Sequence, residues 1–137
     1  MPNYGYPDSS QPFTLNPLVA EGAEKSDRLL GAIWVSALPQ DKDKTIESLK
    51  LIGEKGLIAL KATCLLGGTL NPEGWDEESS ELWNMILDAA AENDMPIHIH
   101  TSPSGGSDID NALAMIKKMV NEIRYMWFTW GEASVAI

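Results

Sequence analysis

The two histidines of the chain lie two residues apart, in the segment Met95-Pro-Ile-His-Ile-His-Thr-Ser-Pro103. In a β-strand, residues i and i+2 point to the same face, so His98 and His100 should project side by side while Ile97 and Ile99 pack behind them. Neutral imidazole is the commonest metal ligand and the usual general base near neutral pH. A histidine in an apolar strand is also commonly a hydrogen-bonded core residue. The pair is therefore a candidate site whose meaning depends on the fold around it.

A second polar pair, Lys61 and Thr63, lies in the apolar run 57–66. The alternation predicts a strand with an apolar face, formed by Ile58, Leu60 and Ala62, and a small polar face that carries Lys61 and Thr63. A lysine that loses water at the end of a strand has a lowered pKa, and it can react with CO2 or hold an anionic substrate. The alternative is a lysine whose amine reaches solvent beyond the strand end.

Strands and helices alternate along the chain about every 35 residues, and these elements must position the candidate residues. Such alternation is typical of βαβ units and a parallel sheet. Four prolines in residues 1–17 predict an irregular N-terminal arm. Two glycine-rich segments follow predicted strands, Gly67-Gly68 and Ser104–Ser107. Each could be a flexible turn or a loop whose backbone amides approach an anion. The tail from residue 131 has no clear pattern. Strands are expected at 30–38, 57–66, 96–100 and 125–130, and helices at 18–26, 43–55, 76–93 and from 108 or 110 to about 122.

Two architectures fit this alternation: a small doubly wound sheet and a segment of a (β/α)8 barrel. Strands of a doubly wound sheet tend to be apolar on both faces, whereas a polar inner face near the C-terminal strand ends suits the mouth of an active-site barrel. We therefore favour an α/β fold in which residues 18–137 form about half of a (β/α)8 TIM barrel. Such a half-barrel leaves two unpaired sheet edges and one uncovered face, which predicts a homo-oligomer.

Composition limits the partners. The chain has 137 residues, the usual size of one domain, and a net charge of −10. An acidic surface repels phosphates and anionic lipid, so we expect neither a nucleic acid nor a membrane as a partner. One cysteine excludes an internal disulfide framework. The sequence shows neither a secretory signal pattern nor an apolar run of about 20 residues, so a cytoplasmic location is expected.

Three segments, taken in order, resemble the metal-dependent amidohydrolase superfamily, in particular its amidohydrolase-2 group, which includes aminocarboxymuconate-semialdehyde decarboxylase. Ser26-Asp-Arg-Leu-Leu-Gly31 is similar to that group's P-D-R-F-x-G entry to a strand, and Gly56-Leu-Ile-Ala-Leu-Lys61 to its G-x-x-G-x-K strand. Residues 82–95 followed by Pro96-Ile-His-Ile-His-Thr101 are similar to its A-x-x-x-x-x-P-x-x-x-H-T segment.

The resemblance implies a hydrolase or decarboxylase that acts on a small molecule at a divalent metal, with zinc favoured over manganese or iron. It implies His100 as a metal ligand and places Lys61 at a family lysine. We expect Lys61 and His98 to be catalytic, and Thr63, Thr101 and Ser102 to bind substrate. His100 and Lys61 should project from neighbouring strands into a shared hollow at the C-terminal strand ends.

The departures from the family pattern support an alternative. No histidine precedes His98, and residues 128–131, where the resemblance would place a further histidine, read Phe-Thr-Trp-Gly. A catalytic zinc site uses about three protein ligands. The alternative function is therefore a non-catalytic, self-associating α/β module derived from the same fold.

Overall fold

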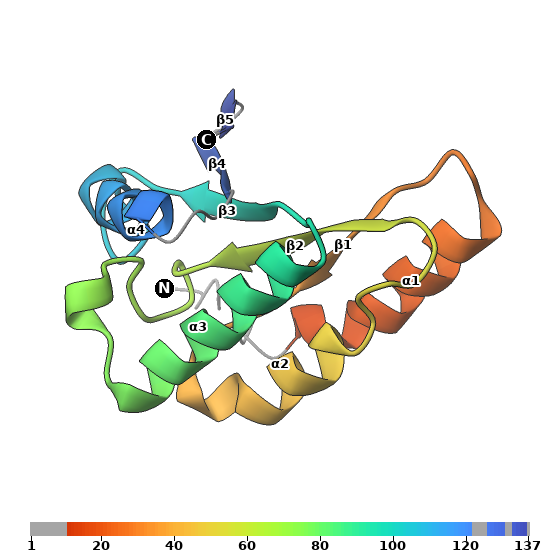
Figure 1. Cartoon of the computed structure of the whole chain (residues 1–137), viewed down its shortest axis with the longest axis horizontal. Helices are drawn as coiled ribbons and strands as arrows, with labels where there is room; N and C mark the ends of the chain where they lie inside the picture. Colours follow the sequence, from red (N-terminus) through yellow and green to blue (C-terminus); the bar gives the residue numbers. More distant parts are fainter. Residues whose placement is uncertain (1–10, 122–125, 131–132, 137) are drawn as a thin grey trace, which may run out of the picture.

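A five-stranded sheet with the spatial order β1-β2-β3-β4-β5 organises the molecule (Figure 1). The structure is a computed structural model that describes residues 11–121, 126–130 and 133–136, with side chains described for residues 11–121. β1 to β4 are parallel, and β5 runs antiparallel to β4. The strands are β1 (Gly31–Trp34), β2 (Leu57–Thr63), β3 (Ile97–Thr101), β4 (Met126–Trp130) and β5 (Ala133–Ala136).

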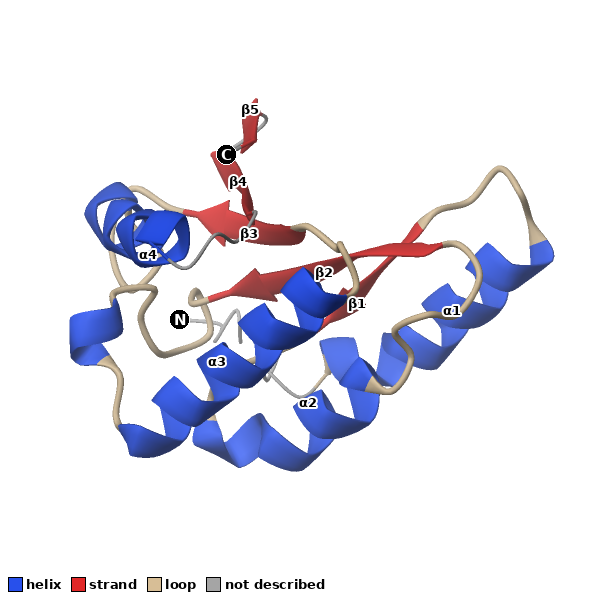
Figure 2. Cartoon of the chain, viewed as in Figure 1, coloured by secondary structure: helices blue, strands red, loops and turns tan. Residues whose placement is uncertain are grey.

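The helices α1, α2 and α3 lie together on one side of the sheet, and α4 lies beside β3 (Figures 1 and 2). Neighbouring parallel strands are consecutive in the chain, so the strand order does not reverse as it does in a doubly wound sheet. The predicted βαβ units and parallel sheet are confirmed, and the sheet is open within the described residues. The helices are α1 (Asn16–Lys25), α2 (Lys42–Leu49), α3 (Glu77–Glu92) and α4 (Ile109–Asn121), with short 3-10 turns η1 (Pro12–Leu15), η2 (Pro39–Asp41) and η3 (Pro72–Gly74).

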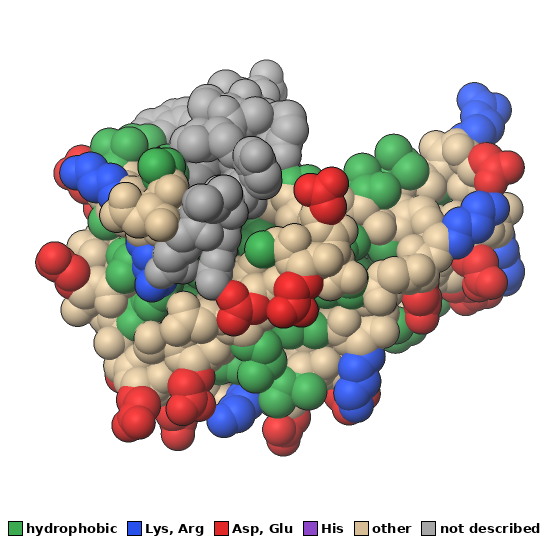
Figure 3. All heavy atoms as spheres, in the orientation of Figure 1, with side chains coloured by type: hydrophobic (Ala, Val, Ile, Leu, Met, Phe, Trp, Pro, Cys, Tyr) green, Lys and Arg blue, Asp and Glu red, His purple; other side chains and the backbone are tan. Residues whose placement is uncertain are grey.

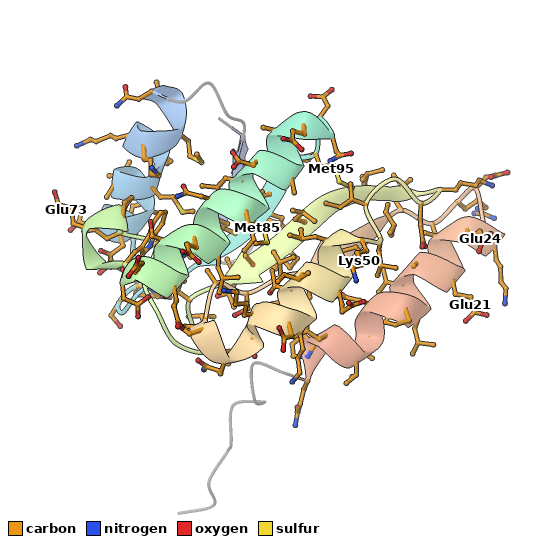
Figure 4. All side chains as sticks on the ribbon, turned by 60° about the horizontal axis from the view of Figure 1, so that its bottom comes forward. Glu21, Glu24, Lys50, Glu73, Met85 and Met95 are labelled. Carbon is orange, nitrogen blue, oxygen red and sulfur yellow. The ribbon has the colours of Figure 1, made fainter. Side chains whose placement is uncertain are left out.

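The hydrophobic core lies between the sheet and these helices. Every second residue is buried along β3 and from Leu60 to Thr63 in β2, because alternate side chains of a strand share a face. The helices turn their apolar stripes to the same core and keep charged residues outward, as the acidic residues along the molecule show in Figure 3. In Figure 4, which brings the helices forward, Glu21, Glu24 and Met85 lie on the outer surface. The fully buried side chains include Ile33, Leu60, Ile97, Ile99, Leu82, Ile86, Leu87, Met115 and Met119.

Local chemistry fixes the ends of α3, which lies within one residue of its predicted bounds. The Asp76 carboxylate accepts a hydrogen bond from the Ser79 N–H at 2.7 Å and so caps the helix N-terminus. The Asn93 N–H donates to carbonyls of the last turn, and Asp94 then adopts a positive φ of 53°. β3 likewise matches its prediction to within one residue at each end.

The first two strands are shorter than predicted because side chains take over their pairing. Beyond β1, the Ser36 N–H donates to Thr45 Oγ1 rather than to β2. Beyond β2, the Cys64 N–H donates to Ser107 Oγ. The prediction that Ile58 shares the apolar face is also wrong. The register shifts between Gly31 and Ala32, and Ile58 is 49% exposed.

The predicted irregular arm is wrong at its C-terminal end. Residues 12–15 form η1 and α1 begins at Asn16, while residues 1–10 lie outside the described residues. The first-turn position of Pro17 explains the helix start, since proline needs no hydrogen-bond partner there. The tail contains β5, which the sequence pattern did not indicate.

The two edge strands of this open sheet are β1 and β5, and a side chain closes the β1 edge in part. At the β1 edge, the Asn16 side-chain amide donates to the Trp34 carbonyl and accepts from the Trp34 N–H, both at 2.9 Å. Asn16 thus replaces a neighbouring strand at that position. At the other end of the parallel strands, β5 pairs with β4. No helix in the described part of the chain has the length and apolar character needed to cross a membrane.

Candidate functional site

The register of β2 and β3 brings four predicted site residues to one face of the sheet. Lys61 pairs with His98, and Thr63 pairs with His100. We call Lys61, Thr63, His98 and His100 the polar face. Neighbouring strands lie about 4.8 Å apart and a strand rises about 3.3 Å per residue, so the α-carbons of Lys61 and His100 are about 8 Å apart on the diagonal. All four side chains are partly buried.

Two other predicted residues lie elsewhere. Thr101 is 3% exposed and follows Ile97 and Ile99 onto the core side of β3, opposite the histidines. Ser102 comes directly after the strand, and its hydroxyl donates a hydrogen bond to the Ser104 carbonyl at 2.7 Å. The structure therefore brings neither hydroxyl to the polar face.

The electrostatics of the polar face favour neutral groups. Burial lowers the pKa of the Lys61 amine below its usual value. Burial also lowers the pKa of His98, and the positive charges of Lys61 and His100 lower it further. The described strands β1 to β3 contain no aspartate or glutamate, so no carboxylate from these strands offsets the effect.

Two ring nitrogens beside Lys61 are buried without a hydrogen-bond partner in the described part of the chain, Trp34 Nε1 and His98 Nε2. Trp34 and His98 pair with Lys61 from either side, so the three residues form a row across β1, β2 and β3. An unsatisfied buried polar group costs about 1–3 kcal/mol, and such groups in native proteins commonly mark a functional site. Sequence reasoning missed Trp34, although its alternation with Ile33 within β1 indicates the same face.

The donors present do not make a complete metal centre. Among the residues that the structure describes, no three or more His, Cys, Asp or Glu side chains lie together as a metal would require. His98 and His100 supply two imidazoles, one fewer than the usual catalytic zinc site. Cys64 does not supply the third ligand, because its side chain is buried in the hydrophobic core with Leu60 and Ala62, on the side of the sheet away from the histidines.

The glycine-rich loops beyond β2 and β3 pack on each other. A side chain on Gly106 would place its Cβ 1.9 Å from the Gly68 carbonyl oxygen, so only glycine allows this approach. The Leu70 N–H donates to the Gly106 carbonyl at 2.8 Å. These loops are therefore packed connections rather than flexible turns.

A separate cleft of about 190 Å³ lies at the C-terminal ends of β1 and β2, next to the N-terminus of α3. Its lining includes Leu38, Cys64, Gly68, Trp75, Asp76 and Ser79. The Asp76 carboxylate already caps the helix there, which disfavours an anionic ligand. Thr63 of the polar face and the Gly67-Gly68 turn noted in the sequence also line this cleft.

Comparison of the chain with protein-family models, with curated proteins and with solved structures finds no significant match. The functional interpretation therefore depends on the geometry described above.

Proposed function

We propose that the chain is an amidohydrolase-like hydrolase or decarboxylase domain that acts on a small molecule at the polar face. The observation that carries the proposal is the parallel register that sets Lys61 beside His98 and Thr63 beside His100. A partly buried amine next to two imidazoles offers a nucleophile and a proton carrier at one place, which both reaction classes use.

The architecture supports the barrel-segment part of the proposal. Consecutive parallel strands that lie side by side, with α1, α2 and α3 on the face opposite the histidines, are the arrangement of successive units in a (β/α)8 barrel. In such a barrel the polar face would line the interior near the C-terminal strand ends, where barrel enzymes carry their sites. The antiparallel β5 departs from that repeat.

The geometry supports a site at the polar face better than it supports the divalent metal that the resemblance implies. Two imidazoles do not complete a catalytic centre, so we assign no metal-dependent step to the polar face. These residues by themselves would hold a ligand and exchange a proton, with His98 as the basic residue in register with Lys61.

Metal titration tests directly whether the proposed function depends on a divalent metal. The full chain, treated with EDTA and desalted, is titrated with Zn²⁺ while the imidazole resonances of its two histidines are followed by NMR. Metal-dependent action predicts a stoichiometric shift of both resonances that His98→Ala or His100→Ala abolishes. Glu73→Gln, which removes an exposed carboxylate of η3, serves as the control and should leave the shift intact. If neither resonance moves, the metal-dependent hydrolase is rejected.

The incomplete ligand set favours a second candidate function, a non-catalytic module that associates with itself through the polar face. Asn16 closes the β1 edge at Trp34, so association at this face is favoured over association at that edge. Light scattering over a range of concentrations tests it. A dimer that Lys61→Glu disrupts, and that Lys117→Glu on the exposed side of α4 leaves intact, supports the module. A monomer at every concentration rejects it.

A further inference from the structure

Lys61 differs from the ion-paired lysines of the chain. Four lysines each lie beside a carboxylate, and all of these are largely exposed: Lys25, Lys42, Lys50 and Lys55. Lys61 is partly buried in the middle of β2, with Trp34 and His98 beside it, and forms no ion pair within the described residues. An ion pair would stabilise the ammonium form, and its absence favours the neutral amine.

We propose that Lys61 forms an imine with small 2-oxo acids bound at the polar face. The amine lone pair attacks the carbonyl carbon, and the carbonyl oxygen takes up a proton to give a carbinolamine. The nitrogen loses one proton on addition and its second proton as the C=N bond forms, the hydroxyl oxygen takes up that second proton, and the C–O bond breaks to release water. No oxidant or metal is needed, since the overall change is amine plus carbonyl to imine plus water.

The neighbours of Lys61 fit the two proton transfers. His98 pairs directly with Lys61, and its Nε2 is buried without a hydrogen-bond partner among the described residues, so it can accept or donate a proton there. Lys61 is partly buried and forms no ion pair within the described residues, which favours the neutral amine that the addition requires.

The charges of the polar face favour an anionic carbonyl compound. Its ionisable groups are Lys61, His98 and His100, which are cationic or neutral, and strands β1 to β3 contain no acidic residue. A ligand carboxylate therefore meets no like charge from these strands, although the chain as a whole carries −10. The hydroxyl of Thr63, in register with His100, adds a neutral polar group.

Reductive trapping tests the inference. The full chain is incubated with glyoxylate and sodium cyanoborohydride in the presence of EDTA, and the modified lysines are identified by peptide mass spectrometry. We expect Lys61 to be labelled at least about tenfold faster than the exposed Lys44. Lys61→Arg should remove that label, whereas Lys44→Arg should leave it unchanged. Labelling spread over the exposed lysines, with no preference for Lys61, would overturn the proposal.

Two further measurements separate the imine from general amine reactivity. His98→Gln keeps Lys61 and should slow its labelling at least severalfold, with a circular dichroism spectrum like that of the original chain. Propionaldehyde, which has no carboxylate, should label Lys61 more slowly than glyoxylate. Equal rates for the two aldehydes would remove the 2-oxo acid selectivity, and an unchanged rate in a folded His98→Gln would remove the role of His98.

The inference depends on the proposed function only for the place of the site. Because trapping is run with EDTA, its failure overturns the imine without bearing on the Zn²⁺ titration. A failed titration in turn leaves the trapping result valid.

Discussion

At the scale of single residues, the environment of the polar face changes what ordinary side chains can do. Burial lowers the pKa of both Lys61 and His98, and the neighbouring Lys61 and His100 lower the pKa of His98 further. The sequence predicted their common face through the alternation of strand residues. It did not predict the unsatisfied ring nitrogen of Trp34, because that follows from how β1 packs beside β2.

The lowered pKa of His98 predicts that acid destabilises the fold. An imidazole with a lowered pKa in the folded chain binds a proton more readily after unfolding, so the free energy of unfolding falls as the pH drops through the ordinary histidine pKa of about 6.5. Urea unfolding on both sides of that pH should show the decrease, and His98→Gln should make it smaller. Equal pH dependence in both proteins would contradict this assignment.

Cys64 should be chemically inert in the folded protein. Its thiol is buried with a pKa of about 12, so almost no thiolate is present near neutral pH. We expect Ellman's reagent to react with the folded chain at least about a hundredfold more slowly than with the chain in concentrated guanidinium, because the thiolate is the reactive form. Similar rates in the two states would show that the thiol is accessible.

At the scale of elements, the loops at the C-terminal strand ends are held by backbone contact. The Ser107 hydroxyl accepts from the Cys64 N–H at 2.8 Å, and the Ser107 carbonyl accepts from the Ser102 N–H at 2.9 Å. The first bond joins the loop after β2 to the loop after β3, and the second closes the loop after β3 on itself. The glycine spacing indicated turns, but only the tertiary structure brings Gly68 against Gly106.

Substitution of two glycines should therefore have opposite effects. In Gly106→Ala, the new Cβ would collide with the Gly68 carbonyl oxygen, and we expect a loss of about 3 kcal/mol of unfolding free energy. Gly22 lies inside α1, where an added Cβ meets only one side-chain atom, at 4.0 Å. Gly22→Ala should be stabilising by about 0.5–1 kcal/mol, because glycine is a poor helix former. Urea denaturation measures both, and a neutral Gly106→Ala would contradict the packed-loop interpretation.

At the scale of the whole molecule, the ends of the sheet determine how it can assemble. Asn16 is 3% exposed and donates to Ser48 Oγ as well as to the Trp34 carbonyl. It therefore ties the start of α1 to both β1 and α2. A strand edge satisfied in this way is a poor template for pairing with another chain.

Loss of the Asn16 amide should affect both stability and assembly. Asn16→Ala removes its three hydrogen bonds, and we expect the free energy of unfolding to fall by about 2–3 kcal/mol. Light scattering should also show more self-association, since the Trp34 N–H and carbonyl become available. Asn84→Ala in α3 is the matched control, expected to change stability by no more than about 0.5 kcal/mol. Equal effects of the two substitutions would exclude edge closure by Asn16.

The order of the four helices and the four parallel strands, and the common face of Lys61, Thr63, His98 and His100, could be predicted from the sequence, whereas β5 could not. Hydrophobic periodicity specifies which residues must be buried, and this sufficed for α3, β3 and the shared face of Lys61, Thr63, His98 and His100. Alternation within a strand depends on local backbone geometry, so it can be read without knowing the neighbours.

Only the tertiary structure decided where the strands end, which edges are closed and which donors meet. The early end of β2 depends on Ser107, 43 residues away, and the closed β1 edge depends on Asn16, 18 residues before Trp34. The exposure of Ile58 likewise follows from register and packing, whereas the core side of Thr101 follows from its alternation with Ile97 and Ile99. These contacts join residues distant in the chain, and the periodicity of a single segment carries no information about its partner.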